Sequence, residues 1–222
     1  CTNSATTKEH VPPLSFFPED QRKDLITVPS CEDHNNSNSK DVEYARNIVT
    51  TMFGVNALGQ KLFADKSLRS FDHSPALIYK TFSDIPPVNL QETAVGAFTV
   101  DRQRVITVMR ACIRALHFRE TGERVLGWEI ILPNLAFTDG VPQEQVAWWY
   151  QSLALFSQIL FKVRTTNSPA VFEYATADIP YGPVYAMRFY KSFLVYAYKS
   201  PEGGIRKAGT EQAQGLPDLL RR

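Results

Sequence analysis

The first 45 residues constrain the fold most, because they combine Cys and His, which are rare in this chain, with prolines that break regular structure. Thr7-Lys8-Glu9-His10-Val11-Pro12-Pro13 comes first, and Pro29-Ser30-Cys31-Glu32-Asp33-His34-Asn35-Asn36 follows after a polar stretch. The chain holds 4 His and 3 Cys, and four of these residues lie in this segment: Cys1, His10, Cys31 and His34. Pro12-Pro13 excludes a helix directly after His10 and favours an extended exit. The segment therefore predicts extended chain around potential metal ligands.

A strand and a helix are expected within this segment. Leu25-Ile26-Thr27-Val28 is a β-branched run that Pro29 should end, and residues 15–24 before it read as a loop. Ser39 is a good N-cap for a helix over residues 40–52, whose first turn is acidic. One face of that helix is apolar: Val42, Ala45, Ile48, Val49 and Met52. The predicted order is an extended strand or turn, a strand and a helix.

Later periodicities predict further elements of both kinds. Helices are expected over residues 55–70, 101–118 and 143–160, with Asp101 as an N-cap and Gly122 as a stop. Strands are expected over residues 128–132, 170–174 and 185–198. Residues 71–96 contain several prolines and read as a connection, and residues 200–222 read as a polar tail. These elements indicate an α+β protein.

Bulk properties narrow the class of protein. The 222 residues suffice for a sizeable core, and a net charge of +1 gives no overall basic field for nucleic acid. With no apolar run of membrane-spanning length, we expect no membrane partner and a cytoplasmic location with reduced thiols. We divide the chain into residues 1–53, residues 54–200 and a tail over 201–222. The middle range has no role that its sequence defines, beyond a possible protein partner or homo-oligomer contact.

Cys31 and His34 are separated by two residues, a spacing that lets a thiolate and an imidazole bind one Zn²⁺. Cys1 stands where an earlier knuckle would supply another ligand, and the fourth ligand would precede Cys1. The plainer interpretation is a buried cysteine and a surface histidine.

Glu9-His10 carries the second kind of chemistry. A histidine beside a carboxylate can act as a general base at neutral pH, and the carboxylate can hold a divalent cation. The amide oxygen of Asn35 is a neutral, hard ligand suited to Mg²⁺ or Mn²⁺. An isolated Glu-His pair is also common on protein surfaces by chance.

Taken together, the pattern Cys…Thr-Lys-Glu-His-Val-Pro-Pro…Asp-Leu-Ile-Thr-Val-Pro-Ser-Cys-x-x-His-Asn-Asn…Ser-Lys-Asp-x-Glu-Tyr resembles bacterial HNH endonucleases of the ββα-metal, treble-clef type over residues 1–46. The resemblance implies an N-terminal ββα-metal motif followed by a mixed α+β domain. It implies that His10 is the general base and that Glu9 and Asn35 hold a catalytic Mg²⁺ or Mn²⁺. It also implies a structural Zn²⁺ on Cys1, Cys31 and His34. Asp24 takes the place of the motif's middle Asn, which precedes the second strand in that family.

The expected function is metal-dependent cleavage of nucleic acid, with DNA favoured over RNA. The alternative is a non-catalytic, zinc-stabilised treble-clef module that binds nucleic acid or a protein partner, which fits the eight acidic and four basic residues in positions 1–45. Arginines in the helix over 101–118 either contact phosphate or were selected for helix propensity. Trp148-Trp149-Tyr150 either stacks on bases or belongs to a core or dimer interface. Cys112 is expected in the core, and His73 and His117 receive no role.

Overall fold

The computed structural model describes residues 5–32, 39–69, 88–90, 93–95, 100–135, 162–164, 166–180 and 182–199. Helices and antiparallel sheets occur together, so the fold is α+β as predicted. Several expectations lie outside these residues: the helix over 143–160 with its aromatic cluster, most of the connection over 71–96, and the tail over 200–222. No helix in the described part is both long and apolar enough to cross a bilayer.

The chain begins with two strands and a helix in the predicted order. Strand β1 (Thr7–His10) pairs antiparallel with β2 (Thr27–Ser30), and helix α2 (Ser39–Thr51) follows. Two short 3₁₀ turns, η1 (Leu14–Phe16) and η2 (Glu19–Gln21), occupy the predicted loop. The prediction that Pro29 ends β2 is wrong, because the strand runs through Pro29 opposite Lys8. Both strands of a two-stranded sheet are edges, where a missing backbone N–H is tolerated.

Helix α2 matches its prediction closely. Ala45, Ile48 and Val49 are buried, and Val42 and Met52 pack against the core from its margin. A buried polar contact ties α2 to the next helix, because Ser67 Oγ donates to Asn47 Oδ1 at 2.8 Å. That next helix covers much of the predicted range 55–70, as α3 (Ala57–Leu62) continued by the π-helical turn η3 (Phe63–Ser67).

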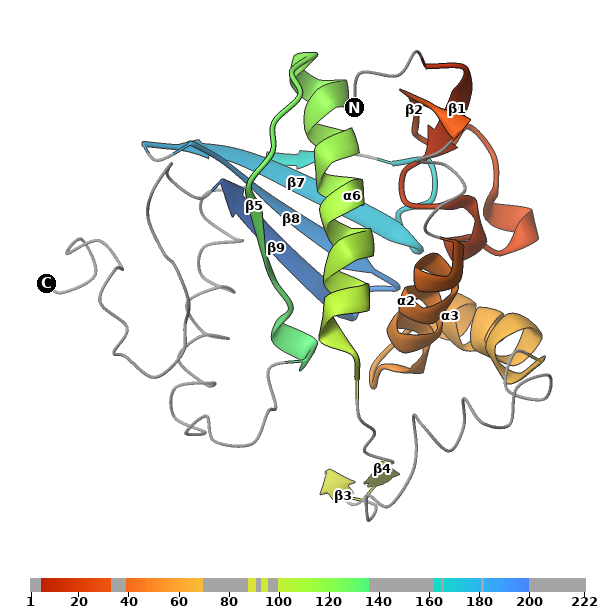
Figure 1. Cartoon of the computed structure of the whole chain (residues 1–222). Coiled ribbons are helices and arrows are strands. Elements are labelled where there is room, and N and C mark those ends of the chain that lie inside the picture. Colours follow the sequence, from red (N-terminus) through yellow and green to blue (C-terminus); the bar gives the residue numbers. More distant parts are fainter. Residues whose placement is uncertain are drawn as a thin grey trace, which may run out of the picture.

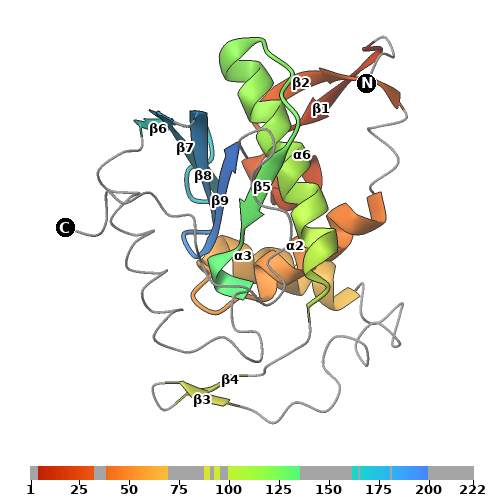
Figure 2. The same cartoon turned by 60° about the vertical axis from the view of Figure 1, so that its left-hand side comes forward.

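The longest helix, α6 (Arg102–Thr121), lies across a five-stranded sheet, with the N-terminal segment beside it (Figure 1). Its start and stop follow the sequence: the Asp101 side chain accepts from the N–H of Arg104, and Gly122 takes a left-handed conformation (φ +76) after the last turn. Buried residues repeat along one side from Val105 to His117. Figure 2 shows α6 lying between the large sheet and the β1–β2 hairpin.

The large sheet has the order β5–β9–β8–β7–β6, and every neighbouring pair is antiparallel. Its strands are β5 (Trp128–Ile131), β6 (Lys162–Arg164), β7 (Phe172–Ile179), β8 (Gly182–Phe189) and β9 (Phe193–Lys199). A 3₁₀ turn, η4 (Pro133–Leu135), follows β5. A separate hairpin joins β3 (Val88–Leu90) and β4 (Thr93–Val95).

The prediction of one strand over residues 185–198 is wrong, because the chain reverses direction inside it. Tyr190 and Lys191 both have positive φ (49° and 63°), and the N–H of Ser192 donates to the carbonyl of Phe189 at 3.0 Å. These are the features of a type I′ turn, which normally uses Asn or Gly. Buried contacts hold the tyrosine in place: its N–H donates to Val171, its carbonyl accepts from Asn56, and its hydroxyl donates to the carbonyl of Phe16.

One hydrophobic cluster unites side chains from residues 1–53 with side chains from residues 54–200. Phe16 and Phe189 lie with ring centroids 5.5 Å apart, and Val11, Val28, Ile48 and Val108 belong to the same cluster. Hydrogen bonds join the same two parts of the chain: Ser168 Oγ donates to the carbonyl of Gln21, and the Asn167 side chain donates to the carbonyl of Asp24. The N-terminal hairpin is therefore packed on the rest of the described chain.

Candidate active site

Glu9 and His10 are the last two residues of β1, where the strand leaves the small sheet. They stand opposite Val28 and Thr27, and both side chains are half-buried. Beyond His10 the pairing continues for one more bond, because the N–H of Val11 donates to the carbonyl of Ile26 at 2.9 Å. The backbone of His10 is thus held on both sides. The chain then bends at Val11 and Pro12, where the sequence predicted an extended exit.

The Glu9 carboxylate has a neighbour that the sequence analysis did not single out. Ser30 Oγ donates to Glu9 Oε2 at 3.3 Å, and it also lies 3.3 Å from the carbonyl oxygen of Cys31. Ser30 is buried, so its contact with the carboxylate is shielded from bulk water. Only the register of β1 against β2 brings these two residues together. A hydroxyl in this place orients the carboxylate without neutralising it.

A small cavity of about 20 Å³ is lined by both residues, although successive side chains of a strand point to opposite faces of the sheet. It is lined by residues from three parts of the fold: Glu9, His10, Val11 and Pro13, then Val42 of α2, then Val108, Ala111, Cys112 and Ala115 of α6. This volume suits about one water molecule. Apart from the acid, the base and the thiol, its walls are apolar, which strengthens electrostatic interactions inside it.

Cys112 is buried, as expected of a core cysteine. Burial raises the pKa of its thiol well above the usual range, and the negative charge of Glu9 raises it further. The thiol therefore stays protonated at neutral pH, and it offers neither a nucleophile nor a thiolate ligand to this cavity.

The predicted metal ligands are only partly described. Cys31 is buried directly after Ser30, whereas Cys1, His34 and Asn35 lie outside the described residues. Within the described ranges, no three His, Cys, Asp or Glu side chains converge as a metal would require. What the structure brings together is Glu9 and His10 on one cavity. Among the residues that line this cavity, the Glu9 carboxylate is the one side-chain oxygen donor of the kind that Mg²⁺ or Mn²⁺ prefers.

Asp24, at the place of the motif's middle Asn, precedes β2 in a left-handed conformation (φ 47). An Asp or Asn adopts this conformation more readily than most residues do. Its carbonyl accepts a hydrogen bond of 2.9 Å from Asn167. This residue therefore shapes the loop between the two strands and anchors it to the second half of the chain.

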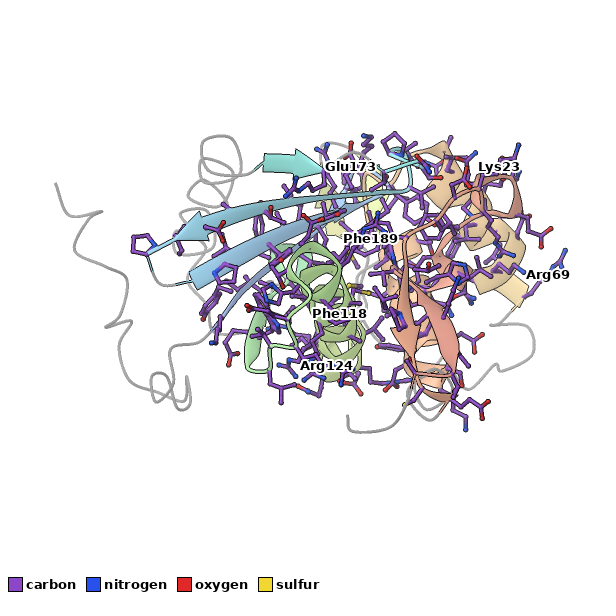
Figure 3. All side chains as sticks on the ribbon, turned by 90° about the horizontal axis from the view of Figure 1, so that it is seen from above. Lys23, Arg69, Phe118, Arg124, Glu173 and Phe189 are labelled. Atoms are coloured by element: carbon purple, nitrogen blue, oxygen red, sulfur yellow. The ribbon has the colours of Figure 1, made fainter. Side chains whose placement is uncertain are left out.

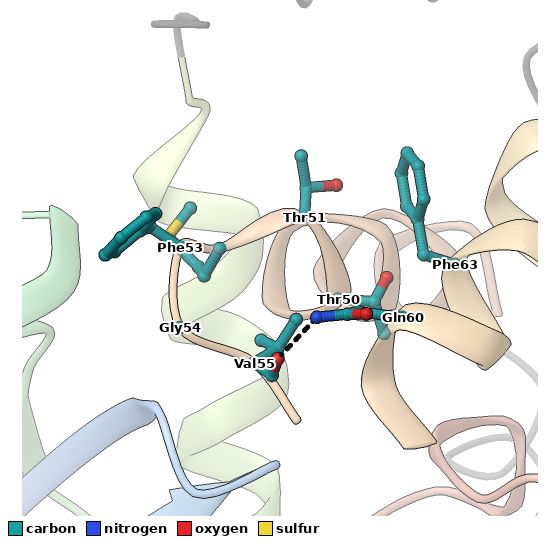
Figure 4. Close-up of a pocket in the computed structure, with 8 residues that line it drawn as sticks. Thr50, Thr51, Phe53, Gly54, Val55, Gln60 and Phe63 are labelled. Atoms are coloured by element: carbon teal, nitrogen blue, oxygen red, sulfur yellow. Dashed lines mark hydrogen bonds between the residues drawn. The ribbon is translucent and has the colours of Figure 1, made fainter. Parts of the chain in front are cut away.

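A larger hollow lies elsewhere, at the end of α2 and the start of α3. It measures about 470 Å³ and is lined by Thr50, Thr51, Met52, Phe53, Gly54, Val55, Gln60 and Phe63 (Figure 4). Both threonine hydroxyls donate to carbonyls of α2, and the Gln60 side chain donates to the carbonyl of Val55. No acid or base lines this hollow, so it lacks the chemistry of the cavity beside Glu9.

His117, to which the sequence assigned no role, is buried between α6 and the sheet. Its Nδ1 lies 2.9 Å from the hydroxyl of Tyr185, and the Trp128 ring packs edge-on against it. Burial lowers the pKa of the imidazole, while the charges of Glu123 and Asp178 act in the opposite direction. The neutral ring is therefore part of the core.

Comparison with family models, with curated proteins and with solved structures finds no match to this chain. The site must therefore be interpreted from its own geometry. It offers a carboxylate oriented by a buried hydroxyl, an adjacent imidazole, and room for one water between them and α6. A carboxylate and an imidazole can each accept a proton.

Proposed function

We propose that this chain is a metal-dependent endonuclease of the HNH type, which hydrolyses nucleic-acid phosphodiester bonds at Glu9 and His10. The order of β1, β2 and α2, with His10 as the last residue of β1, carries the proposal. This is the strand–strand–helix order that the resemblance implied for a ββα-metal motif. The cavity that both residues line supports it, because hydrolysis needs a water within reach of a base.

In this proposal His10 is the general base. Its imidazole accepts a proton from the attacking water, which needs a neutral ring within hydrogen-bond reach of that water. Pairing of the backbone on both sides of His10 fixes the face of the strand on which the ring lies. The apolar wall from α2 and α6 limits the space near the base to about one water.

In this proposal Glu9 and Asn35 would hold the catalytic Mg²⁺ or Mn²⁺. The oxygen of a carboxylate and the oxygen of an amide are the donors that such hard cations prefer. When bound, the cation supplies positive charge that stabilises the negative charge developing on the phosphate. Ser30 keeps the carboxylate directed toward the site.

A structural Zn²⁺ on Cys1, Cys31 and His34 completes the proposal. Cys31 follows β2 directly, so a metal there would fix the chain between β2 and α2. Sulfur and imidazole nitrogen suit Zn²⁺, whereas the oxygens of Glu9 and Asn35 suit Mg²⁺ or Mn²⁺. Two different ions are therefore assigned to two different sets of side chains.

Nicking of supercoiled plasmid tests the proposal. We expect the wild-type chain to nick DNA with Mg²⁺ or Mn²⁺ and to stop when EDTA is added. Glu9→Gln should abolish the ion-dependent cleavage. Glu19→Gln is the matched control, because the Glu19 side chain is 79% exposed and lies outside the cavity.

Two outcomes would contradict catalysis. If the folded wild-type chain cleaves neither DNA nor RNA with either ion, the enzyme assignment is wrong. If it binds nucleic acid or a protein without cleavage, the non-catalytic treble-clef module is correct instead.

A further inference from the structure

The large sheet has an inner face, which packs against α6, and an outer face on the opposite side. The hydroxyl of Tyr174 donates to Glu120 of α6 at 2.7 Å, so this side chain of β7 lies on the inner face. Successive side chains of a strand point to opposite faces, so Glu173 and Ala175 lie on the outer face. Figure 3 shows Phe189, a residue of the core cluster, between Glu173 and α6.

The middle of the outer face is apolar and aromatic. Cross-strand pairing aligns two rows of these side chains over β7, β8 and β9: Ala175, Ala186 and Tyr196 in one row, and Ala177, Val184 and Tyr198 in the next. Ile131 of β5 extends the first row to the edge of the sheet. The alanines form a shallow floor on β7 and β8, with tyrosine rings beside it on β9. A charged side chain is absent from both rows over these three strands.

The first of these rows is buried, although it is not part of the core. Ala175 and Tyr196 are 8% and 6% exposed, and neither belongs to the hydrophobic cluster around α6. A tyrosine on an open sheet face would expose much of its ring, so another part of the chain shields it. Among the described residues, η4 directs Leu135 into the core cluster, and α3 meets the sheet at the β8–β9 turn, where the N–H of Asn56 donates to the carbonyl of Tyr190. The shield therefore comes from elsewhere in the chain.

The order of the strands indicates which residues these are. β5 and β6 are the two edge strands, and the antiparallel pairings between them make them parallel to each other. Residues 136–161 join η4 to β6, so this connection passes from one edge of the sheet to the other, over about 19 Å at about 4.8 Å per strand. Parallel strands are usually joined by a helix that packs on a face of the sheet. Since α6 occupies the inner face, the outer face remains for the connection.

The sequence of the connection fits this position. One side of the helix expected over residues 143–160 is apolar, at alternating spacings of three and four residues: Val146, Trp149, Leu153, Phe156 and Leu160. Large side chains on a helix complement small ones on the sheet that it covers, because the two surfaces then interdigitate without voids. The alanine floor on β7 and β8 provides such small side chains.

We infer that residues 143–160 form an amphipathic helix that crosses the outer face of the sheet and packs Trp149 over the alanines of β7 and β8. The cluster Trp148-Trp149-Tyr150 then belongs to a second hydrophobic layer of this chain, and not to a surface that stacks on bases or joins two copies. This packing is independent of the proposed nuclease function, because it uses none of the residues assigned to catalysis or to metal binding.

The test is the rate at which N-ethylmaleimide modifies a cysteine placed on the outer face of the folded full chain. Ala186→Cys puts a small thiol in the middle of the alanine floor. Glu129→Cys is the matched control, because Glu129 is an exposed residue of β5 that pairs with Tyr198 on the same face. The wild-type chain gives the background rate of its own cysteines.

We expect Ala186→Cys to react about 100-fold more slowly than Glu129→Cys, because the reagent must wait for local opening of the helix. Adding Trp149→Ala should raise the rate at Ala186→Cys about tenfold, since opening becomes easier when the packing is lost. Gln151→Ala, on the opposite side of the expected helix, should leave the rate unchanged. If Trp149→Ala prevents folding, the smaller change Leu153→Ala replaces it. Light scattering should show the same protection in a monomer.

Four results would overturn the inference. Equal rates at Ala186→Cys and Glu129→Cys would show that the face is open. Protection found only in a dimer would assign the face to a second copy, and protection found only with added DNA would assign it to nucleic acid. Protection that neither Trp149→Ala nor Leu153→Ala weakens would assign it to another segment of the chain. Plasmid nicking is measured separately, so its presence or absence does not change these outcomes.

Discussion

The hydroxyl of Tyr190 joins the β8–β9 turn to the N-terminal segment, and its removal should destabilise the whole chain. Tyr190 is fully buried, and its hydroxyl donates to the backbone carbonyl of Phe16, which is itself 1% exposed. Tyr190→Phe keeps the ring and deletes only this donor. The carbonyl of Phe16 then stays in the core without that hydrogen bond.

A buried carbonyl oxygen that loses its donor in this way lowers the free energy of unfolding by roughly 1–3 kcal/mol. A chain of this size loses about 2–4 °C of melting temperature per kcal/mol, so a cost of about 2 kcal/mol corresponds to about 4–8 °C. Urea unfolding followed by far-UV circular dichroism measures the change. Tyr198→Phe is the control, because the described residues include no hydrogen-bond partner for its half-buried hydroxyl.

Equal stability of Tyr190→Phe and Tyr198→Phe would refute this reasoning. The structure further implies that Tyr190→Phe lowers the stability of both halves in a single transition, because one hydrophobic cluster spans them. Two separate unfolding transitions, of which only one shifts, would show that residues 1–53 and 54–200 fold independently.

Three further predictions concern the core, the pH dependence and the site. Gly59→Ala should destabilise the fold by about 1–3 kcal/mol in urea unfolding despite the better helix propensity of alanine, because the added Cβ would lie 2.9 Å from Cγ of Tyr190; an unchanged midpoint would contradict this clash. Burial raises the pKa of Tyr174 to about 12, and other buried tyrosines shift the same way, so stability present below the ordinary pKa of 10.0 should be lost as pH rises above it; a flat stability curve from pH 9 to pH 12 would disprove the linkage. Ser30→Ala should raise the Mn²⁺ concentration for half-maximal cleavage about 10- to 100-fold, because Glu9 loses the hydroxyl that orients it; equal Mn²⁺ dependence would remove Ser30 from the site.

Local signals explain why the helices could be predicted from sequence. Both α2 and α6 have apolar residues at helical spacing; α2 also has Asp41 in its first turn, and α6 has the Asp101 cap. Each of these signals acts within a few residues. The turn at Tyr190-Lys191 could not be predicted, because neither residue favours positive φ on its own. Its conformation is imposed by contacts with Phe16, Asn56 and Val171, which are remote in sequence.

In the candidate site, too, local sequence indicates some residues, and remote contacts determine the others. Glu9 and His10 could be selected from their neighbours in sequence, and β1 places them where the pattern suggested, at a strand end before the prolines. Ser30 and Cys112 could not be selected, because their proximity to Glu9 depends on strand register and on the packing of α6. Arg104 shows how context decides a role, since its contact with Asp41 makes it structural, while Arg114 has no such partner in the described part of the chain.

The catalytic role proposed for His10 can be tested most directly by the rate of plasmid nicking by His10→Ala with saturating Mn²⁺. We predict that this rate falls about 10²- to 10⁴-fold below that of the wild type, as expected for loss of a general base. Circular dichroism and the melting temperature should stay close to those of the wild type, because the side chain is only half-buried. If a folded His10→Ala variant nicks plasmid at the wild-type rate, His10 is not the base and the proposed site is wrong.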